Sequence, residues 1–166
     1  MNLNWQLLIY AVPLGTGATL AMDLWALLLK KACGIPSLDY AMVGRWLGHL
    51  PRGRFRHAGI GRAEPIAGEK ALGWFAHYLT GIAFAAALLA LQGHAWLARP
   101  TLAPALIFGL ASVAAPFLIL QPGMGAGLAA RNTPNPGGAR LRSLSAHASF
   151  GLGLYLAAWP LALCLR

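Results

Sequence analysis

Four long apolar segments alternate along the chain with polar, basic loops. The apolar segments lie at residues 5–29, 71–91, 102–121 and 144–165, and each has roughly the 20 residues that an α-helix needs to cross a bilayer. Residues 30–70 and 122–143 form the two longer loops between them. Because backbone polar groups inside a membrane must be satisfied within the span, the pattern predicts helices. We therefore expect an all-α, single-domain protein over residues 1–166, folded as an integral membrane four-helix bundle.

Proline positions modify two of these expected helices. Pro116 lies inside the third apolar segment and Pro160 lies near the end of the fourth. A proline inside a helix removes one backbone hydrogen bond and clashes with the preceding turn. We expect a kink at each position.

A shorter periodic stretch lies in the first loop, between Ser37 and Leu50. Ser37 is the expected N-cap of this helix and Pro51 its stop signal. An interfacial helix on the membrane surface fits this pattern, with Trp46 at headgroup depth and Arg45 facing phosphates. A loop helix that only covers one end of the bundle fits equally. The apolar residues with helical spacing are Leu38, Met42, Val43, Trp46, Leu47 and Leu50.

Composition agrees with a membrane protein and its charges predict an orientation. The chain is 58% hydrophobic and only 10% charged, which argues against a water-soluble domain. Of its 13 basic residues, 11 lie in the two loops at residues 30–70 and 122–143. Under the positive-inside rule both loops face the cytoplasm and both termini lie outside. A bacterial cytoplasmic (inner) membrane suits this multi-pass topology.

The basic first loop predicts contact with lipid headgroups. Arg52, Arg54 and Arg56, together with Arg45, are the side chains expected to meet anionic headgroups on the cytoplasmic side. Nucleic acid is not an expected partner, because no nucleic-acid motif accompanies the net charge of +9. His49 and His57 lie in the same loop, and we expect them to be solvated or to face lipid.

Polar groups inside the apolar segments mark the candidate site. Asp23 and His77 lie seven residues from Lys30 and Lys70 respectively, about 10 Å inside the cytoplasmic boundary. His147 lies about 8 Å inside, and Gln121 ends the third segment on the same side. Ionisable groups in a membrane are costly and tend to face the bundle interior. We expect one shared polar site, with Gly81 and Gly151 beside the histidines allowing the helices to approach closely.

Several chemistries fit such a site. Asp23, His77 and His147 are candidate metal ligands, and Met124 would add a soft donor. Two histidines on separate helices are also candidate axial ligands of a haem, and Asp23 with a histidine is a candidate proton relay. Alternatively these residues are interhelical packing contacts of an accessory or homo-oligomeric membrane protein. A membrane enzyme acting on a lipid or small apolar substrate remains a further alternative, although no hydrolase or nucleotide-binding motif is present.

Several short segments carry a resemblance to a known family. The chain resembles an uncharacterised family of small four-span bacterial membrane proteins, catalogued with unknown function, over nearly its whole length. The resemblance implies the four-span architecture and carries no activity, cofactor or catalytic residue. The matching segments are Met22-Asp-Leu-Trp25, Val43-Gly-Arg-Trp-Leu-Gly-His49, Arg54-Phe-Arg-His57, Gly73-Trp-Phe-Ala-His-Tyr78, Gln121-Pro-Gly-Met-Gly125, His147 and Gly151-Leu-Gly153.

Overall fold

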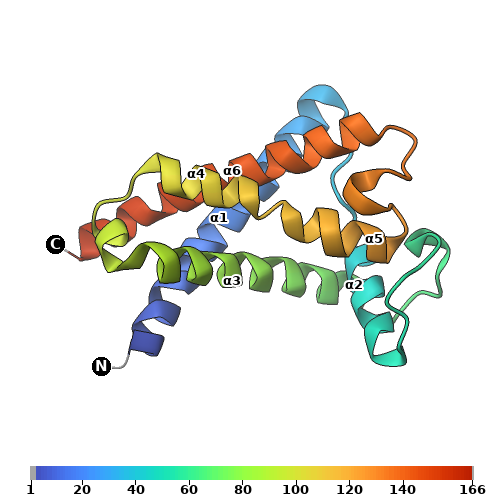
Figure 1. The fold of residues 1–166 in the computed structure, drawn as a ribbon, viewed down its shortest axis with the longest axis horizontal. Coiled ribbons are helices and arrows are strands. Elements are labelled where there is room, and N and C mark those ends of the chain that lie inside the picture. The colour runs from blue at the N-terminus through green and yellow to red at the C-terminus, as the bar shows by residue number, and fades with distance from the viewer. Residues whose placement is uncertain (1–2, 166) are drawn as a thin grey trace. The chain divides into compact units, whose positions relative to one another are not determined.

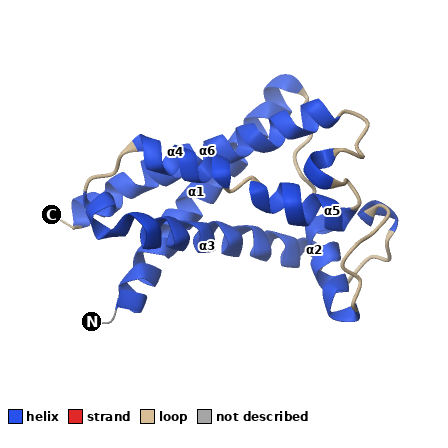
Figure 2. Cartoon of the chain, in the orientation of Figure 1, coloured by secondary structure: helices blue, strands red, loops and turns tan. Residues whose placement is uncertain are grey.

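The computed structural model describes residues 3–165, with side chains from residue 7 onward. Within these residues the secondary structure is helical, with no strand (Figure 2). Four helical stretches are long and apolar enough to cross a membrane: Leu7–Cys33, Glu69–Ala98, Leu102–Met124 and Pro136–Cys164. They coincide with the four apolar segments, so the predicted all-α architecture with four spans is confirmed.

The helices are longer than the apolar pattern alone indicates. Three spans are formed by α1 (Leu3–Cys33), α3 (Glu69–Ala98) and α6 (Pro136–Cys164). The largest difference is the start of α6, which we expected near Leu144. Asn135 explains it, because its side-chain oxygen accepts a hydrogen bond from the Gly138 amide at 2.9 Å. An asparagine cap followed by proline is a strong helix start, even within a run of turn-forming residues.

The third span is the irregular one, as the position of Pro116 predicts. It consists of α4 (Leu102–Ala111), a π-helical turn at Pro116–Leu120 and α5 (Gln121–Met124). The regular helix ends before the proline, because Pro116 has no amide hydrogen to continue the ladder. In α3, Gly93 has a φ of 72°, so the regular part of that helix ends close to the predicted boundary at residue 91.

The chain divides into two compact units. We call residues 1–37, 78–112 and 145–166 the bundle unit, and residues 38–77 and 113–144 the loop unit. Two of the four boundaries fall inside α3 and α6, so each of these helices contributes residues to both units, and the other two boundaries follow α1 and α4. The loop unit contains most of the two predicted cytoplasmic loops, and it holds nine of the 13 basic residues.

Small residues bring the helices of the bundle unit together. A Cβ atom on Gly15 of α1 would lie 2.5 Å from the Ile82 backbone of α3. In the same unit α4 and α6 lie side by side (Figure 1), and the backbones of Gly109 and Gly151 meet there. Contacts of this kind are typical of membrane helix pairs. The prediction that Gly81 and Gly151 allow close approach is confirmed, because a Cβ atom on either would overlap a neighbouring helix.

The loop unit is built around α2 (Tyr40–His49), the short helix predicted in the first loop. Its N-cap is Asp39, whose carboxylate accepts from the Ala41 amide at 2.9 Å, so the prediction of Ser37 as cap is wrong by two residues. The helix continues into a 3₁₀ turn at Leu50–Arg52 that contains Pro51. Gly44 of α2 and Gly73 of α3 lie backbone to backbone, with no room for a Cβ atom on either.

Candidate functional site

Asp23 is paired with a tyrosine on a second helix of the bundle unit. The Tyr78 hydroxyl of α3 donates a hydrogen bond to Asp23 Oδ2 of α1 at 2.9 Å. One helical turn away on both helices, Gly81 lies against the Thr19 side chain. This contact leaves no room for a larger side chain between α1 and α3 at the depth of Thr19 and Gly81. Tyr78 was not among the predicted site residues, although it directly follows His77 in the chain.

His147 is paired with a serine in the same unit. Ser112 Oγ donates to the Gly109 carbonyl at 2.6 Å. His147 Nδ1 lies 2.7 Å from Ser112 Oγ. Because a hydroxyl has one hydrogen, Ser112 accepts from His147, and Nδ1 of the imidazole carries a proton. Ser112 is 8% exposed, so this bond lies in the interior of the bundle unit.

His77 is paired with a tyrosine in the loop unit. Its Nε2 atom lies 2.9 Å from the Tyr40 hydroxyl, and the two ring centroids are 4.3 Å apart. Tyr40 is the first residue of α2, so this bond joins α2 to α3 beside the Gly44–Gly73 contact. Trp74 contacts both rings, with its centroid 4.4 Å from that of Tyr40 and 5.9 Å from that of His77, so the three form one aromatic cluster.

The remaining candidate ligands lie at the end of the third span. Gln121 Nε2 donates to Ser143 Oγ at 3.3 Å, while its Oε1 atom is buried without a hydrogen-bond partner. Met124 is the last residue of α5. Asp23 and His147 belong to the bundle unit, whereas His77, Gln121 and Met124 belong to the loop unit. Within the described part of the chain no three His, Cys, Asp or Glu side chains are grouped so that they could hold a metal ion. The metal and haem hypotheses stay predictions.

Arg45 has a protein partner in addition to any lipid. Its guanidinium forms a two-point ion pair with Glu69, with Nε 2.8 Å from Oε2 and an Nη atom 2.7 Å from Oε1. The other Nη atom faces three backbone carbonyls between residues 60 and 63, at 3.2–3.4 Å. The Glu69 hydrogen bond raises the pKa of Arg45 above its usual value. We therefore regard Arg45 as a structural residue, since its side chain is only 14% exposed.

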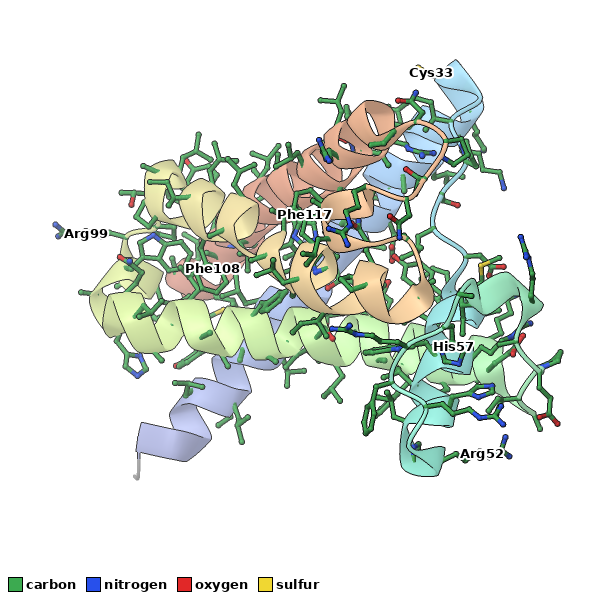
Figure 3. All side chains as sticks on the ribbon, turned by 45° about the vertical axis from the view of Figure 1, so that its right-hand side comes forward. Cys33, Arg52, His57, Arg99, Phe108 and Phe117 are labelled. Carbon is green, nitrogen blue, oxygen red and sulfur yellow. The ribbon has the colours of Figure 1, made fainter. Side chains whose placement is uncertain are left out.

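The other three arginines predicted to meet lipid headgroups lie on the surface of the loop unit. Arg52, Arg54 and Arg56 are all exposed, and Figure 3 shows Arg52 directed away from the loop unit. Phe55 lies between them in the chain and is 63% exposed. An exposed aromatic ring among cations suits an anionic membrane surface. The headgroup prediction now depends on these three side chains.

His49 and His57 are not solvated, contrary to our expectation. His49 is fully buried, and its Nε2 atom lies 2.9 Å from the Glu64 carbonyl. His57 is half-buried among the turns of the loop unit (Figure 3), and its ring centroid lies 5.0 Å from that of His49. The burial of His49 was predictable from the sequence, because His49 follows Met42 and Trp46 at helical spacing on the apolar face of α2.

Three of the segments that carry the family resemblance meet around these histidines. Trp46 donates from Nε1 to the Phe55 carbonyl at 3.0 Å, and its ring fills the space beside Gly123. The backbone amide of His57 donates to the Gly123 carbonyl at 3.0 Å. Segments 43–49, 54–57 and 121–125 therefore form one cluster around the buried His49 and the half-buried His57. Trp46 packs within that cluster, so its presence in α2 is explained by these contacts without a role at lipid headgroups.

A small cavity lies elsewhere in the bundle unit. Its volume is about 180 Å³, and it is lined mainly by leucines of α1 and α3. Tyr10 and His94 are its polar side chains, with ring centroids 5.9 Å apart. An apolar cavity of this size admits only a small ligand.

Comparison with known proteins identifies the family. The family described as "Protein of unknown function (DUF2938)" matches residues 12–161, so the chain belongs to it. No curated protein and no solved structure matches the chain. The expectation of an uncharacterised family is thereby confirmed.

Proposed function

We propose that this DUF2938 member is a multi-pass protein of the bacterial cytoplasmic membrane that binds and transfers protons at Asp23. In this proposal both termini lie outside, and the two basic loops face the cytoplasm. The distribution of basic residues supports that orientation, with 11 of 13 in those loops. Of the four acidic residues, Asp23 is the one that lies well inside a candidate span.

The hydrogen bond between Tyr78 and Asp23 is the observation that carries the proposal. A carboxylate inside a span is costly, and carboxylates held there serve proton transfer in pumps and transporters. The Tyr78 hydroxyl, 2.9 Å from Oδ2, stabilises the ionised form. The protonated form can keep the contact, because a phenol both donates and accepts. The pair therefore accommodates both protonation states without moving α1 or α3.

The two histidine pairs favour a proton over the other ligands in our hypothesis. Ser112 with His147, and Tyr40 with His77, repeat the pairing of a titratable group with a hydroxyl. Such pairs suit proton transfer, since each member can change from donor to acceptor. In each pair the nitrogen that contacts the hydroxyl could bind haem or metal only after that contact is broken, whereas proton exchange needs no such change.

Proton flux into proteoliposomes tests the proposal. The protein is reconstituted with a pH-sensitive dye inside, and a potassium gradient with valinomycin supplies the driving voltage. We expect wild-type vesicles to acidify or alkalinise in response to the voltage, and Asp23→Asn vesicles to behave like empty ones. Asparagine keeps the size and the hydrogen-bond acceptor of Asp23 but cannot exchange a proton.

Asp39→Asn is the matched control for this experiment. Asp39 lies outside the candidate spans and caps α2, a position where asparagine serves as well. Its vesicles should retain the wild-type flux. Equal flux in wild-type, Asp23→Asn and empty vesicles would contradict the proposal.

A second candidate function is that of an accessory protein in which these pairs serve packing. The observation that favours it is the tight contact of Gly15 and Gly81 in the α1–α3 interface that also contains Asp23 and Tyr78. Interhelical hydrogen bonds in membranes contribute about 0.6 kcal/mol on average. If packing is the whole role, Asp23→Asn lowers the unfolding temperature and no variant changes proton flux.

A further inference from the structure

Two buried imidazole nitrogens in the loop unit have no hydrogen-bond partner. They are Nδ1 of His49 and Nε2 of His57. Leaving a buried polar atom unpaired costs about 1–3 kcal/mol, so an unpaired atom in a folded protein calls for an explanation. The proton proposal uses neither histidine.

The backbone around each ring fixes which nitrogen carries the hydrogen. His49 Nε2 lies 2.9 Å from the Glu64 carbonyl, and a carbonyl can only accept, so Nε2 is the donor. His57 Nδ1 faces the Gly123 carbonyl at 3.4 Å and is the donor by the same argument. The two unpaired nitrogens therefore bear lone pairs. An imidazole that donates one N–H to a carbonyl and offers its other nitrogen is the usual arrangement of a metal-binding histidine.

The spacing of the rings fits two ligands of one metal ion. With metal–nitrogen bonds of about 2.0–2.1 Å, and a ring centroid about 1.1 Å behind each nitrogen, two imidazoles on a tetrahedral ion have centroids about 5 Å apart. The observed separation is 5.0 Å, with the ring planes at 86°. This centroid separation is the one that two imidazole ligands of a single tetrahedral ion require.

We propose that His49 and His57 bind a transition-metal ion of the Zn²⁺ or Cu⁺ class through Nδ1 and Nε2 respectively. Imidazole nitrogens suit these ions, and both accept tetrahedral geometry. No third His, Cys, Asp or Glu joins the pair among the described residues, so water or an exogenous ligand completes the coordination. A site with two open positions binds an ion reversibly, as metal handling or sensing requires.

The surrounding fold holds both rings in place before the ion arrives. Gly125 has a φ of 95° and lies against the backbone of His57 and Ala58, with no room for a side chain. His49 is held at the end of α2, where its neighbour Gly48 contacts Ile66. Preorganised ligands favour binding, because little conformational freedom is lost when the ion enters.

Metal content of the purified protein tests the proposal. The protein is purified in detergent with a tag that contains no histidine, stripped with a chelator, and dialysed against buffered micromolar Zn²⁺. We expect one zinc per chain by mass spectrometry of the elements. His57→Gln should remove it, and this variant is preferred to His49→Gln because His57 is only half-buried. Circular dichroism verifies that each variant is folded.

His94→Gln is the matched control. His94 lines the apolar cavity of the bundle unit, so this variant should retain one zinc per chain. Co²⁺ provides a second readout, since tetrahedral Co²⁺ absorbs visible light strongly, and His57→Gln should lose that absorption. Cu⁺, added under reducing conditions, distinguishes the two ions by competition with Zn²⁺. Absence of zinc from the wild type would overturn the proposal. Equal zinc in the wild type and in folded His57→Gln would do the same.

Discussion

The bundle unit and the loop unit differ in the contacts that stabilise each of them internally. In the bundle unit, small residues bring helices into contact, and hydroxyl pairs such as Tyr78–Asp23 join them. In the loop unit, side chains mostly bind backbone carbonyls: Arg45 faces the 60–63 segment, Trp46 binds Phe55, and His49 binds Glu64. A continuous helix satisfies its own backbone, whereas irregular turns leave carbonyls that need donors.

Because of this difference, we propose different chemistry for the polar side chains of the two units. In the bundle unit, Thr19 and Ser112 donate to carbonyls one turn away along the chain, whereas Asp23 is bonded to Tyr78 of another helix and is the proton site of our proposal. In the loop unit His49 and His57 each use one nitrogen to satisfy a carbonyl and present the other. The same residue type is thus a hydroxyl partner at His147 and a candidate metal ligand at His49.

The glycine contact of the loop unit should give the largest effect. Gly73→Val would push a side chain into the backbone of Tyr40, which cannot yield without displacing α2. Overpacking of this kind costs about 3 kcal/mol. Unfolding in detergent, followed by tryptophan fluorescence, should show this loss. Gly59→Ala is the control, because nothing lies within 4 Å of its Cβ position. Unchanged stability of Gly73→Val would mean that α2 is not docked on α3.

The corresponding change in the bundle unit should cost less. A Cβ atom on Gly151 of α6 would lie 2.9 Å from the backbone of Ala105 and Leu106 on α4. Two helices can separate slightly to admit one methyl group, so Gly151→Ala should cost about 1–2 kcal/mol. The same unfolding measurement applies. A cost as large as that of Gly73→Val would show that the bundle unit is no more adaptable than the loop unit.

The ion pair of the loop unit should have a smaller effect than either glycine contact. Glu69→Gln leaves the Arg45 guanidinium with its backbone carbonyls but without a counter-charge. We expect a lower unfolding temperature, less reduced than in Gly73→Val, with a difference from wild type that shrinks in high salt. A difference that does not depend on salt would indicate that hydrogen bonding, not charge, is what Glu69 provides.

Removing single hydroxyls should give the smallest effects. Tyr78→Phe deletes the bond to Asp23 in the bundle unit, and Tyr40→Phe deletes the bond to His77 in the loop unit. Each should cost about 0.6 kcal/mol, the average for interhelical hydrogen bonds in membranes. Only Tyr78→Phe should also alter proton flux. An equal change of proton flux in Tyr40→Phe would indicate that Asp23 is not the proton site.

The sequence predicts the bundle unit better than the loop unit for a physical reason. Spans are defined by length and hydropathy, both of which are local, and all four are where we expected them. Helix ends depend on single capping residues. The cap at Asn135 makes α6 start earlier than predicted, and Asp39, not the predicted Ser37, caps α2. The Pro116 irregularity was predictable because proline acts on its own helix.

The partners of the polar side chains were not predictable from spacing. Equal depth suggested that Asp23, His77 and His147 share one site, but each is bonded to a hydroxyl that the depth argument did not include. The partners of Arg45 and His49 were not foreseen, because Glu69 and the carbonyls between residues 60 and 64 that they contact lie 15 or more residues away along the chain. Periodicity reports which face of a helix is apolar, and it does not report which carbonyls an irregular loop leaves unpaired.

Infrared spectroscopy of Asp23 is the most direct test of the central claim, that this carboxyl exchanges a proton. With only four acidic side chains in the protein, the stretching band of a protonated carboxyl can be assigned by substitution. We predict that a pH titration of the reconstituted wild type shows a reversible carboxyl band that is missing in Asp23→Asn and shifted in Tyr78→Phe. Identical carboxyl spectra for wild type and Asp23→Asn across the titration would contradict the account.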